Sequence, residues 1–191
     1  IPPNVRHPQM ILHWESFEQE VLQYVRTVIE PITETVLPPV FEILDAEIRT
    51  EVPMLQAFIS QNYLRPVAIH FGATVITSDY GNLVGSTDSH FQREGKTIII
   101  NEYKGKWSLN PEWFQNGRID QLNMNHYIRD AITQLYTYLV VNHLQHGILT
   151  SSDFTFFFKR VKVENAADGF EQLFISTGIA HDSTNPTVLQ S

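Results

Sequence analysis

The spacing of apolar residues changes about one third of the way along the chain. In the first third, apolar residues recur at steps of three and four, which is the period of amphipathic helices. This spacing predicts helices over residues 11–29, 39–49 and 50–61. From residue 66 onward, short runs rich in β-branched and aromatic residues replace that pattern, and such runs are typical of β-strands.

Six strands are predicted in this second part of the chain. They are 66–71, 73–77, 83–91, 96–104, 153–160 and 170–176. Gly95 makes the third and fourth strands a hairpin, because glycine accepts the backbone angles of a tight turn. A helical pattern over 119–145 separates the fourth strand from the fifth. This order predicts an α/β or α+β fold with a mixed central β-sheet flanked by helices.

We expect the 191 residues to form one domain, since this length suits a single hydrophobic core. Within it we distinguish a helical N-terminal part, 1–62, from a core of strands and helices, 63–191. Hydrophobic residues make up 42% of the chain, which argues for an ordered globular protein. Every apolar run is far shorter than the roughly 20 residues that span a bilayer, so no membrane partner is expected.

Charge is distributed unevenly along the chain. The net charge of −8 argues against broad adhesion to nucleic acid, and the acidic residues are concentrated in the first 51 positions. Basic residues gather between Arg93 and Arg129 and again at 159–162, where any anion-binding surface is expected. The second group has two interpretations, a solvated cluster that discourages strand aggregation and a contact with phosphates. The absence of cysteine excludes disulfides and thiolate metal sites and fits a reducing, intracellular compartment.

The strand 96–104 changes character at its end, where three isoleucines are followed by Glu-Tyr-Lys. Because side chains alternate along a strand, Glu102 and Lys104 share a face with Ile98 and Ile100. On its own, such an E-x-K tripeptide is more often a solvated edge or a surface ion pair. An edge strand is seldom this apolar, so the surrounding sequence favours a buried site.

Asp88 lies in the hairpin partner of that strand, and pairing across the turn brings its carboxylate toward Glu102. Two carboxylates in a desolvated place are costly unless a cation neutralises them. A hard divalent ion such as Mg²⁺ or Mn²⁺ accepts carboxylate and carbonyl oxygens. Lys104 is then placed to orient a water molecule or to offset charge on a phosphate.

The motif STD-x13-E-x-K, followed by a helix carrying QLYTY, resembles the PD-(D/E)XK nuclease superfamily. The joint order of LVGSTDSHF, IIINEYK, QLYTYLVVNHLQHGILTSSDFTFFFKR and NPTVLQS is similar to the nuclease-like domain of fungal crinkler-type effectors and of proteins with fungal-type kinase-like domains. The resemblance covers about residues 83–188. It implies a restriction-endonuclease-like core, here with extra N-terminal helices, and a Mg²⁺- or Mn²⁺-dependent nuclease acting on DNA or RNA.

The resemblance also implies roles for the residues that match its motifs. Asp88 and Glu102 would bind the metal ion together with the Tyr103 backbone carbonyl, and Lys104 would assist hydrolysis. Gln134, from a Q-x3-Y motif, would support the catalytic group. Further candidates are Glu51 or Glu47 as a helix-borne third ligand, and Lys106 and Tyr138 as substrate contacts. His90, two residues after Asp88, is either another substrate contact or a half-buried strand histidine.

Several alternatives stay open. Gln134 and Tyr138 are one helical turn apart, and such a pair can also be a packed, hydrogen-bonded part of the core. His143 and His146 are read as a helix C-terminal cap in preference to a zinc pair. Two positions depart from the superfamily pattern, since Thr87 replaces a proline and Tyr103 is bulky where a small β-branched residue is usual.

Three functional classes are therefore weighed. The first is an active nuclease, with a nuclear destination in a host cell implied by the effector resemblance. The second is a catalytically inactive nuclease-fold module that binds protein or nucleic acid, which the acidic N-terminal half favours. A viral cap-snatching endonuclease is a weaker third class, because those domains lack the NPTVLQS-type ending. Any kinase-like partner domain, and any targeting signal, is expected outside these residues.

Overall fold

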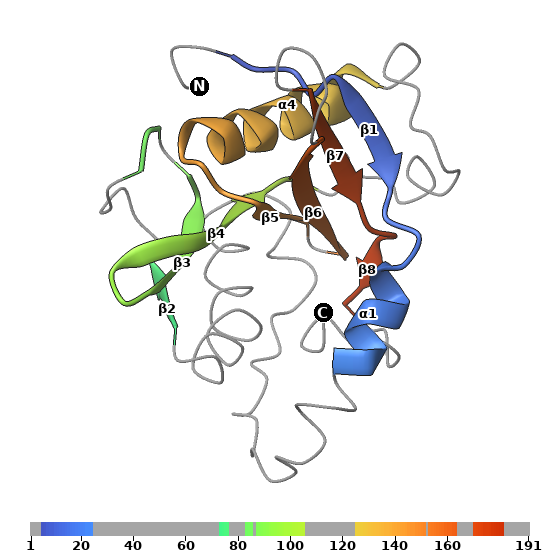
Figure 1. The fold of residues 1–191 in the computed structure, drawn as a ribbon, viewed down its shortest axis with the longest axis horizontal. Helices are drawn as coiled ribbons and strands as arrows, with labels where there is room; N and C mark the ends of the chain where they lie inside the picture. The colour runs from blue at the N-terminus through green and yellow to red at the C-terminus, as the bar shows by residue number, and fades with distance from the viewer. Residues whose placement is uncertain are drawn as a thin grey trace, which may run out of the picture.

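The computed structural model describes residues 5–24, 73–76, 83–85, 87–105, 125–151, 153–163 and 170–181. Within these residues, eight strands form one mixed sheet that is accompanied by two helices (Figure 1). The strands are β1 Met10–His13, β2 Thr74–Ile76, β3 Ser89–Arg93, β4 Lys96–Tyr103, β5 His146–Thr150, β6 Phe154–Lys162, β7 Glu171–Ile175 and β8 Ile179–Ala180; the helices are α1 Phe17–Tyr24 and α4 His126–Val141. The prediction of a mixed α/β fold is confirmed.

The strands follow the order β1-β7-β6-β5-β4-β3-β2, and β8 pairs with β6 outside this row. Two neighbouring pairs are parallel, β1 with β7 and β4 with β5, whereas the remaining pairs are antiparallel. Because α4 lies between β4 and β5 in the sequence, the chain can return and place β5 beside β4 in the same direction. The predicted hairpin is β3 and β4.

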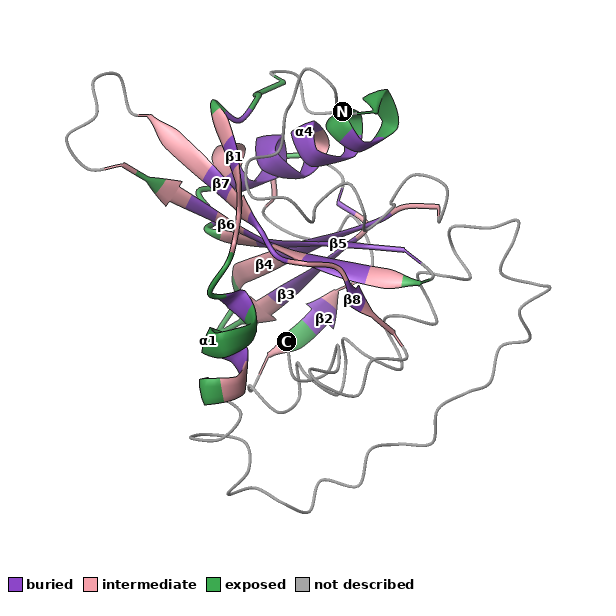
Figure 2. Cartoon of the chain, turned by 90° about the vertical axis from the view of Figure 1, so that its right-hand side faces the viewer, coloured by how far each residue is buried: buried purple, intermediate pink, exposed green. Residues whose placement is uncertain are grey.

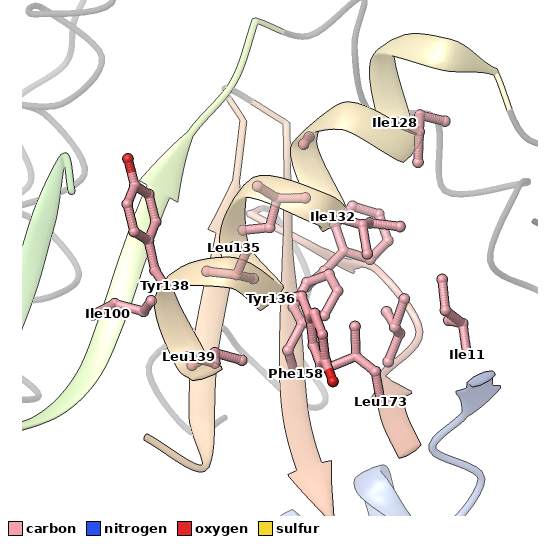
Figure 3. Close-up of a cluster of buried hydrophobic side chains, with 14 of the residues drawn as sticks. Ile11, Ile100, Ile128, Ile132, Leu135, Tyr136, Tyr138, Leu139, Phe158 and Leu173 are labelled. Carbon is pink, nitrogen blue, oxygen red and sulfur yellow. The ribbon is translucent and has the colours of Figure 1, made fainter. Parts of the chain in front are cut away.

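Helix α4 covers one face of the sheet (Figures 1 and 2). Its residues Ile128, Ile132, Leu135 and Leu139 are spaced by three or four positions, and each is at most 1% exposed. They pack in one cluster with Ile100, Leu149, Phe156, Phe158 and Leu173 of the sheet (Figure 3). At Gly147 an added Cβ would lie only 3.1 Å from Leu135 and 3.3 Å from Leu139, so glycine permits the close approach of helix and strand. This packing holds α4 against β4.

A β-bulge interrupts the hairpin. Phe91 pairs with Ile99, but Gln92 pairs with Thr97, so Ile98 is the extra residue. Ile98 consequently packs with Phe91 in a second cluster, on the sheet face opposite α4, whereas Ile100 packs beneath the helix. The prediction that Ile98 and Ile100 share a face is wrong, because alternation of side chains breaks at a bulge.

The N-terminal part begins with a strand, not with a helix. β1 pairs in parallel with β7, from Met10 opposite Gln172 to His13 opposite Ile175. Helix α1 begins only after Ser16, whose carbonyl accepts from the Glu20 N–H at 2.9 Å. The prediction of a helix over 11–29 is therefore wrong at its start, since pairing with a distant strand outweighs the local helical period. The predicted helices 39–49 and 50–61 and the predicted strand 66–71 lie outside the described residues.

The long helix ends earlier than its pattern predicts. α4 stops at Val141, where the Asn142 side-chain amide donates to the Tyr138 carbonyl at 2.9 Å. His143 follows with a left-handed φ of 56°, and His146 already belongs to β5. The cap thus lies at Asn142 and not just before Gly147. In the described part of the chain, neither helix is long and apolar enough to cross a membrane.

Candidate active site

Four of the predicted site residues meet at the end of β4. Glu102 is the penultimate residue of β4, Lys104 follows the strand directly, and Gln134 lies in the middle of α4. Asp88 precedes β3, whose Ser89 pairs with Asn101, so the same register places Asp88 opposite Glu102. The hairpin and the helix together therefore bring these side chains to one place.

Gln134 hydrogen-bonds to both charged residues of the E-x-K motif. Its Nε2 donates to Glu102 Oε2 at 3.0 Å, and its Oε1 accepts from Lys104 Nζ at 2.9 Å. Lys104 Nζ also lies 3.5 Å from Glu102 Oε2. Since an ammonium only donates and a carboxylate only accepts, these partners determine which way the amide points. Gln134 therefore holds Lys104 beside the carboxylate.

Asp88 is tied to the same strand end through the backbone. Its Oδ2 accepts a hydrogen bond of 2.7 Å from the N–H of Tyr103, the residue between Glu102 and Lys104. The Asp88 charge is close enough to Glu102 to disfavour a second negative charge there. Asp88 and Glu102 thus lie at the same end of the hairpin, and a metal ion shared by their carboxylates stays a prediction.

Glu102 is buried with an incompletely satisfied carboxylate. The residue is 1% exposed, and among the described residues its Oε1 has no hydrogen-bond partner. Burial raises the pKa of Glu102 to about 8 and repulsion from the Asp88 charge acts in the same direction, whereas Lys104 and a hydrogen bond from the Asp88 backbone lower it. The negative charge of Glu102 is therefore undercompensated, and a cation beside Oε1 would relieve this.

This raised pKa makes the stability of the metal-free protein depend on pH. Between pH 4.5 and about 8 the folded chain retains a proton on Glu102 that the unfolded chain has released. We expect the free energy of unfolding to fall across this window, by about 1.4 kcal/mol per pH unit from this group. Below the window Glu102 is protonated in both states, and above it Glu102 is ionised in both, so this slope disappears.

Urea unfolding at a series of pH values measures the effect. The control is Glu102→Gln, which keeps the shape of the side chain and cannot ionise, so its stability curve should lack this slope. Parallel curves for the wild type and Glu102→Gln would contradict the assignment of a raised pKa.

Tyr138 and His90 lie beside these residues and are buried. Gln134 Nε2 donates to the Tyr138 hydroxyl at 3.5 Å, and the Tyr138 ring projects from α4 toward β4 (Figure 3). A Cβ at Gly85 would lie 2.5 Å from this ring, so only glycine fits there. His90 Nε2 is 3.1 Å from Gln92 Nε2, and burial lowers the pKa of His90. Both Tyr138 and His90 are 1% exposed, and their contact with a substrate stays a prediction.

The structure does not place three other predicted site residues, the possible metal ligands Glu47 and Glu51 and the substrate contact Lys106. All three lie outside the described residues. Within the described ranges, no three acidic or histidine side chains form a group that could hold a metal ion. The role of the Tyr103 carbonyl stays a prediction, so Asp88 and Glu102 are the two acidic candidates that the structure brings together.

The basic group at 159–162 is divided among different environments. Arg160 is 9% exposed, and its Nη1 lies 3.3 and 3.4 Å from the two carboxylate oxygens of Glu171, which also accepts from the Tyr136 hydroxyl at 2.8 Å. Lys159 Nζ lies 4.8 Å from the centre of the Trp14 ring. Arg160 therefore fits neither interpretation offered by the sequence, since it belongs to a buried ion pair.

Ser89, Asn101 and Asn142 are polar neighbours of the site that the sequence analysis did not single out. Asn101 interrupts a run of isoleucines, and a polar residue inside so apolar a strand was the available signal. Asn142 bonds to the backbone N–H and carbonyl of Val84 at 2.7 and 3.2 Å, which attaches the segment before Asp88 to the end of α4. Nothing in the sequence pattern indicates that contact.

No family model, no curated protein and no solved structure matches this chain.

Proposed function

We propose that this chain is a Mg²⁺- or Mn²⁺-dependent nuclease that hydrolyses phosphodiester bonds of DNA or RNA, with a restriction-endonuclease-like core. The observation that carries the proposal is the buried Oε1 of Glu102, unpartnered among the described residues and close to the charge of Asp88. Lys104 stands beside it, held by Gln134. A buried carboxylate of this kind is unfavourable in an apolar setting and favourable as a ligand.

The donor set fits a hard divalent ion, because Asp88 and Glu102 offer carboxylate oxygens, which such ions prefer. When bound, the ion would supply Lewis acidity and lower the pKa of a coordinated water. Glu102 can use Oε1 as a ligand because Oε2 is already occupied by hydrogen bonds from Gln134 and Lys104. Glu102 is thus held in place through Oε2, while Oε1 remains open to a metal ion.

Lys104 would act on the substrate side of the site. Its side chain is 22% exposed, whereas that of Glu102 is 1% exposed, so the ammonium is the part of the motif that reaches outward. Gln134 Oε1 accepts one of its three protons and Glu102 Oε2 accepts a second, so the third is available to orient a water molecule or to stabilise negative charge on a phosphate. Gln134 acts as a positioning residue for both groups.

The strand arrangement is consistent with this proposal. The acids come from a β-hairpin, the supporting glutamine comes from the following helix, and β5 returns parallel to β4. The resemblance alone supports membership of the PD-(D/E)XK superfamily, affiliation with fungal effector-like proteins, a nuclear location and a kinase-like partner domain.

A second candidate function is an inactive nuclease-fold module that binds protein or nucleic acid. Two observations favour it, the net charge of −8 and the presence of only two acidic candidates in the described part of the site. Such a module would keep the hydrogen-bonded arrangement around Glu102 but would not bind the ion.

Calorimetric titration with Mn²⁺ separates these functions. We expect the wild type to bind Mn²⁺ and Asp88→Asn to lose that binding, because the substitution removes a charged ligand. The control is Asp130→Asn, at a carboxylate that is 72% exposed on α4, which should bind as the wild type does. Single- and double-stranded DNA and RNA are then incubated with and without Mn²⁺. Absence of Mn²⁺ binding by the wild type would overturn the nuclease proposal, and binding without cleavage would favour the module.

A further inference from the structure

A second set of polar side chains lies directly behind the candidate site. Ser89, Asn101 and Tyr103 are at most 2% exposed and point to the sheet face opposite α4, where Tyr103 packs with Phe91 and Ile148. Asn101 Nδ2 donates to Ser89 Oγ at 3.2 Å, and Ser89 Oγ lies 3.3 Å from the Tyr103 hydroxyl. We call these three residues the back-face triad.

Each member of the back-face triad is a chain neighbour of a site residue. Ser89 follows Asp88, whereas Asn101 and Tyr103 flank Glu102. Since side chains alternate along a strand, the triad and the two acids face opposite sides of the same two strand segments. A hydrogen bond between Ser89 and Tyr103 on one face therefore constrains the separation of Asp88 and Glu102 on the other.

The triad is costly to bury. In the described part of the chain, Asn101 Oδ1 has no hydrogen-bond partner, although Asn101 is 0% exposed. Apolar side chains at these positions would avoid that desolvation and would extend the neighbouring hydrophobic cluster. Buried polar contacts of this kind can specify one pairing of strands against others, at a cost in stability.

A constraint on the pairing of β3 with β4 matters because the register of this hairpin already shifts once. The bulge at Ile98 moves the register by one residue between Phe91 and Gln92. A further slip of one residue at the other end would place Asp88 opposite a neighbour of Glu102 and turn side chains to the wrong face. Ser89 and Asn101 form the last pair of the β3–β4 ladder before the two acids, which is where a constraint on register acts on them most directly.

Tyr103 connects both faces. Its backbone N–H donates to Asp88 Oδ2 at 2.7 Å, and its hydroxyl reaches Ser89, the residue that follows Asp88. The side chain is large enough to span this distance, whereas the small β-branched residue usual at this position carries no group that reaches so far. The departure from the superfamily pattern at Tyr103 thus has a physical reason in this chain.

We propose that Ser89, Asn101 and Tyr103 are positioning residues that fix the distance between Asp88 and Glu102 from behind the sheet, an inference that rests on the proposed nuclease function. None of the three touches the substrate through its side chain. Their effect is transmitted through the pairing of β3 with β4 and through the Tyr103 backbone.

The test is Tyr103→Phe, which removes only the hydroxyl. We expect the dissociation constant for Mn²⁺ to rise about tenfold, the lower end of the usual effect of groups that support metal ligands. In the metal-free protein, the Tyr103 amide should exchange its hydrogen faster, because its hydrogen bond to Asp88 is held less firmly. Cleavage should lose kcat while KM for nucleic acid stays the same.

The matched control is Tyr136→Phe. Tyr136 is also buried and donates its hydroxyl to Glu171 at 2.8 Å, on the part of α4 that faces β7. This variant should lower the unfolding temperature and leave both Mn²⁺ affinity and exchange of the Tyr103 amide unchanged. A general loss of stability would change Mn²⁺ affinity and Tyr103 amide exchange in both variants. A change in Tyr103→Phe alone therefore reports the positioning role.

Ser89→Ala provides a second line of evidence. Because it removes the other half of the same hydrogen bond, combining it with Tyr103→Phe should weaken Mn²⁺ binding no more than the stronger single variant does. Wild-type Mn²⁺ affinity and wild-type amide exchange in Tyr103→Phe would overturn the inference. If the wild type itself fails to bind Mn²⁺, the proposed function fails, while amide exchange in the metal-free variants still supports or overturns the positioning role.

Discussion

Cleavage of nucleic acid is expected to fall by about a thousandfold or more when either Glu102 or Lys104 is replaced by alanine. Glu102→Ala removes the carboxylate whose Oε1 faces no partner in the described residues, and Lys104→Ala removes the ammonium held by Gln134. Both variants should keep the fold, because removing a buried, incompletely satisfied carboxylate or a partly exposed lysine leaves the hydrophobic cluster under α4 intact. Cleavage rates with Mn²⁺ are compared for purified proteins with equal circular dichroism.

Lys96→Ala is the matched control for this experiment. Lys96 lies at the other end of the same strand and is exposed, so its removal changes the net charge as Lys104→Ala does without touching the site. It should cleave as the wild type does. Wild-type cleavage by both Glu102→Ala and Lys104→Ala would defeat the assignment of the active site.

The free energy of unfolding is expected to fall by about 3–5 kcal/mol in Glu171→Ala. Glu171 is the acceptor for Arg160, whose side chain is 8% exposed, and for the hydroxyl of Tyr136. Its removal leaves a buried guanidinium without its partner and a buried hydroxyl without its acceptor. Urea unfolding followed by fluorescence measures the loss.

A double variant tests the reason for this effect. Replacing both partners, with Arg160→Met and Glu171→Leu, removes the ion pair and fills its volume with apolar groups, so most of the lost stability should return. A Glu171→Ala variant that unfolds at the same urea concentration as the wild type would show that Arg160 is solvated in solution.

Local chemistry explains what could be predicted of the site. Gly95 and the alternation of the flanking strands define a hairpin, and a hairpin alone is sufficient to place Asp88 near Glu102. The contact of Gln134 with Lys104 spans 30 residues, so no local rule predicts it, and the resemblance to a known motif indicated it. Burial of Tyr138 agrees with the alternative that Gln134 and Tyr138 are a packed pair of the core, whereas its contact with the separate segment that contains Gly85 has no local signal in the sequence.

Errors in the predicted fold arise where a partner is distant or a pattern is ambiguous. The apolar spacing after Met10 predicts a helix where β1 lies, because the pairing partner β7 is too distant to influence the local pattern. β5 is not predicted at all, because the helical pattern ends at 145 and the five residues that follow are too few to display a period. The bulge at Ile98 moved that side chain to the other face, and three consecutive isoleucines give no sign of where alternation breaks.

The pairing of β1 with β7 also bears on how the protein is made. Met10 emerges from the ribosome 162 residues before its partner Gln172, so β1 cannot pair with β7 until that stretch has been synthesised. Contacts so far apart in sequence slow folding, because a large loop must close before they contribute. The hairpin that carries Asp88 and Glu102 can form as soon as its own residues are synthesised, whereas the sheet edge made by β1 is completed only after β7 has followed.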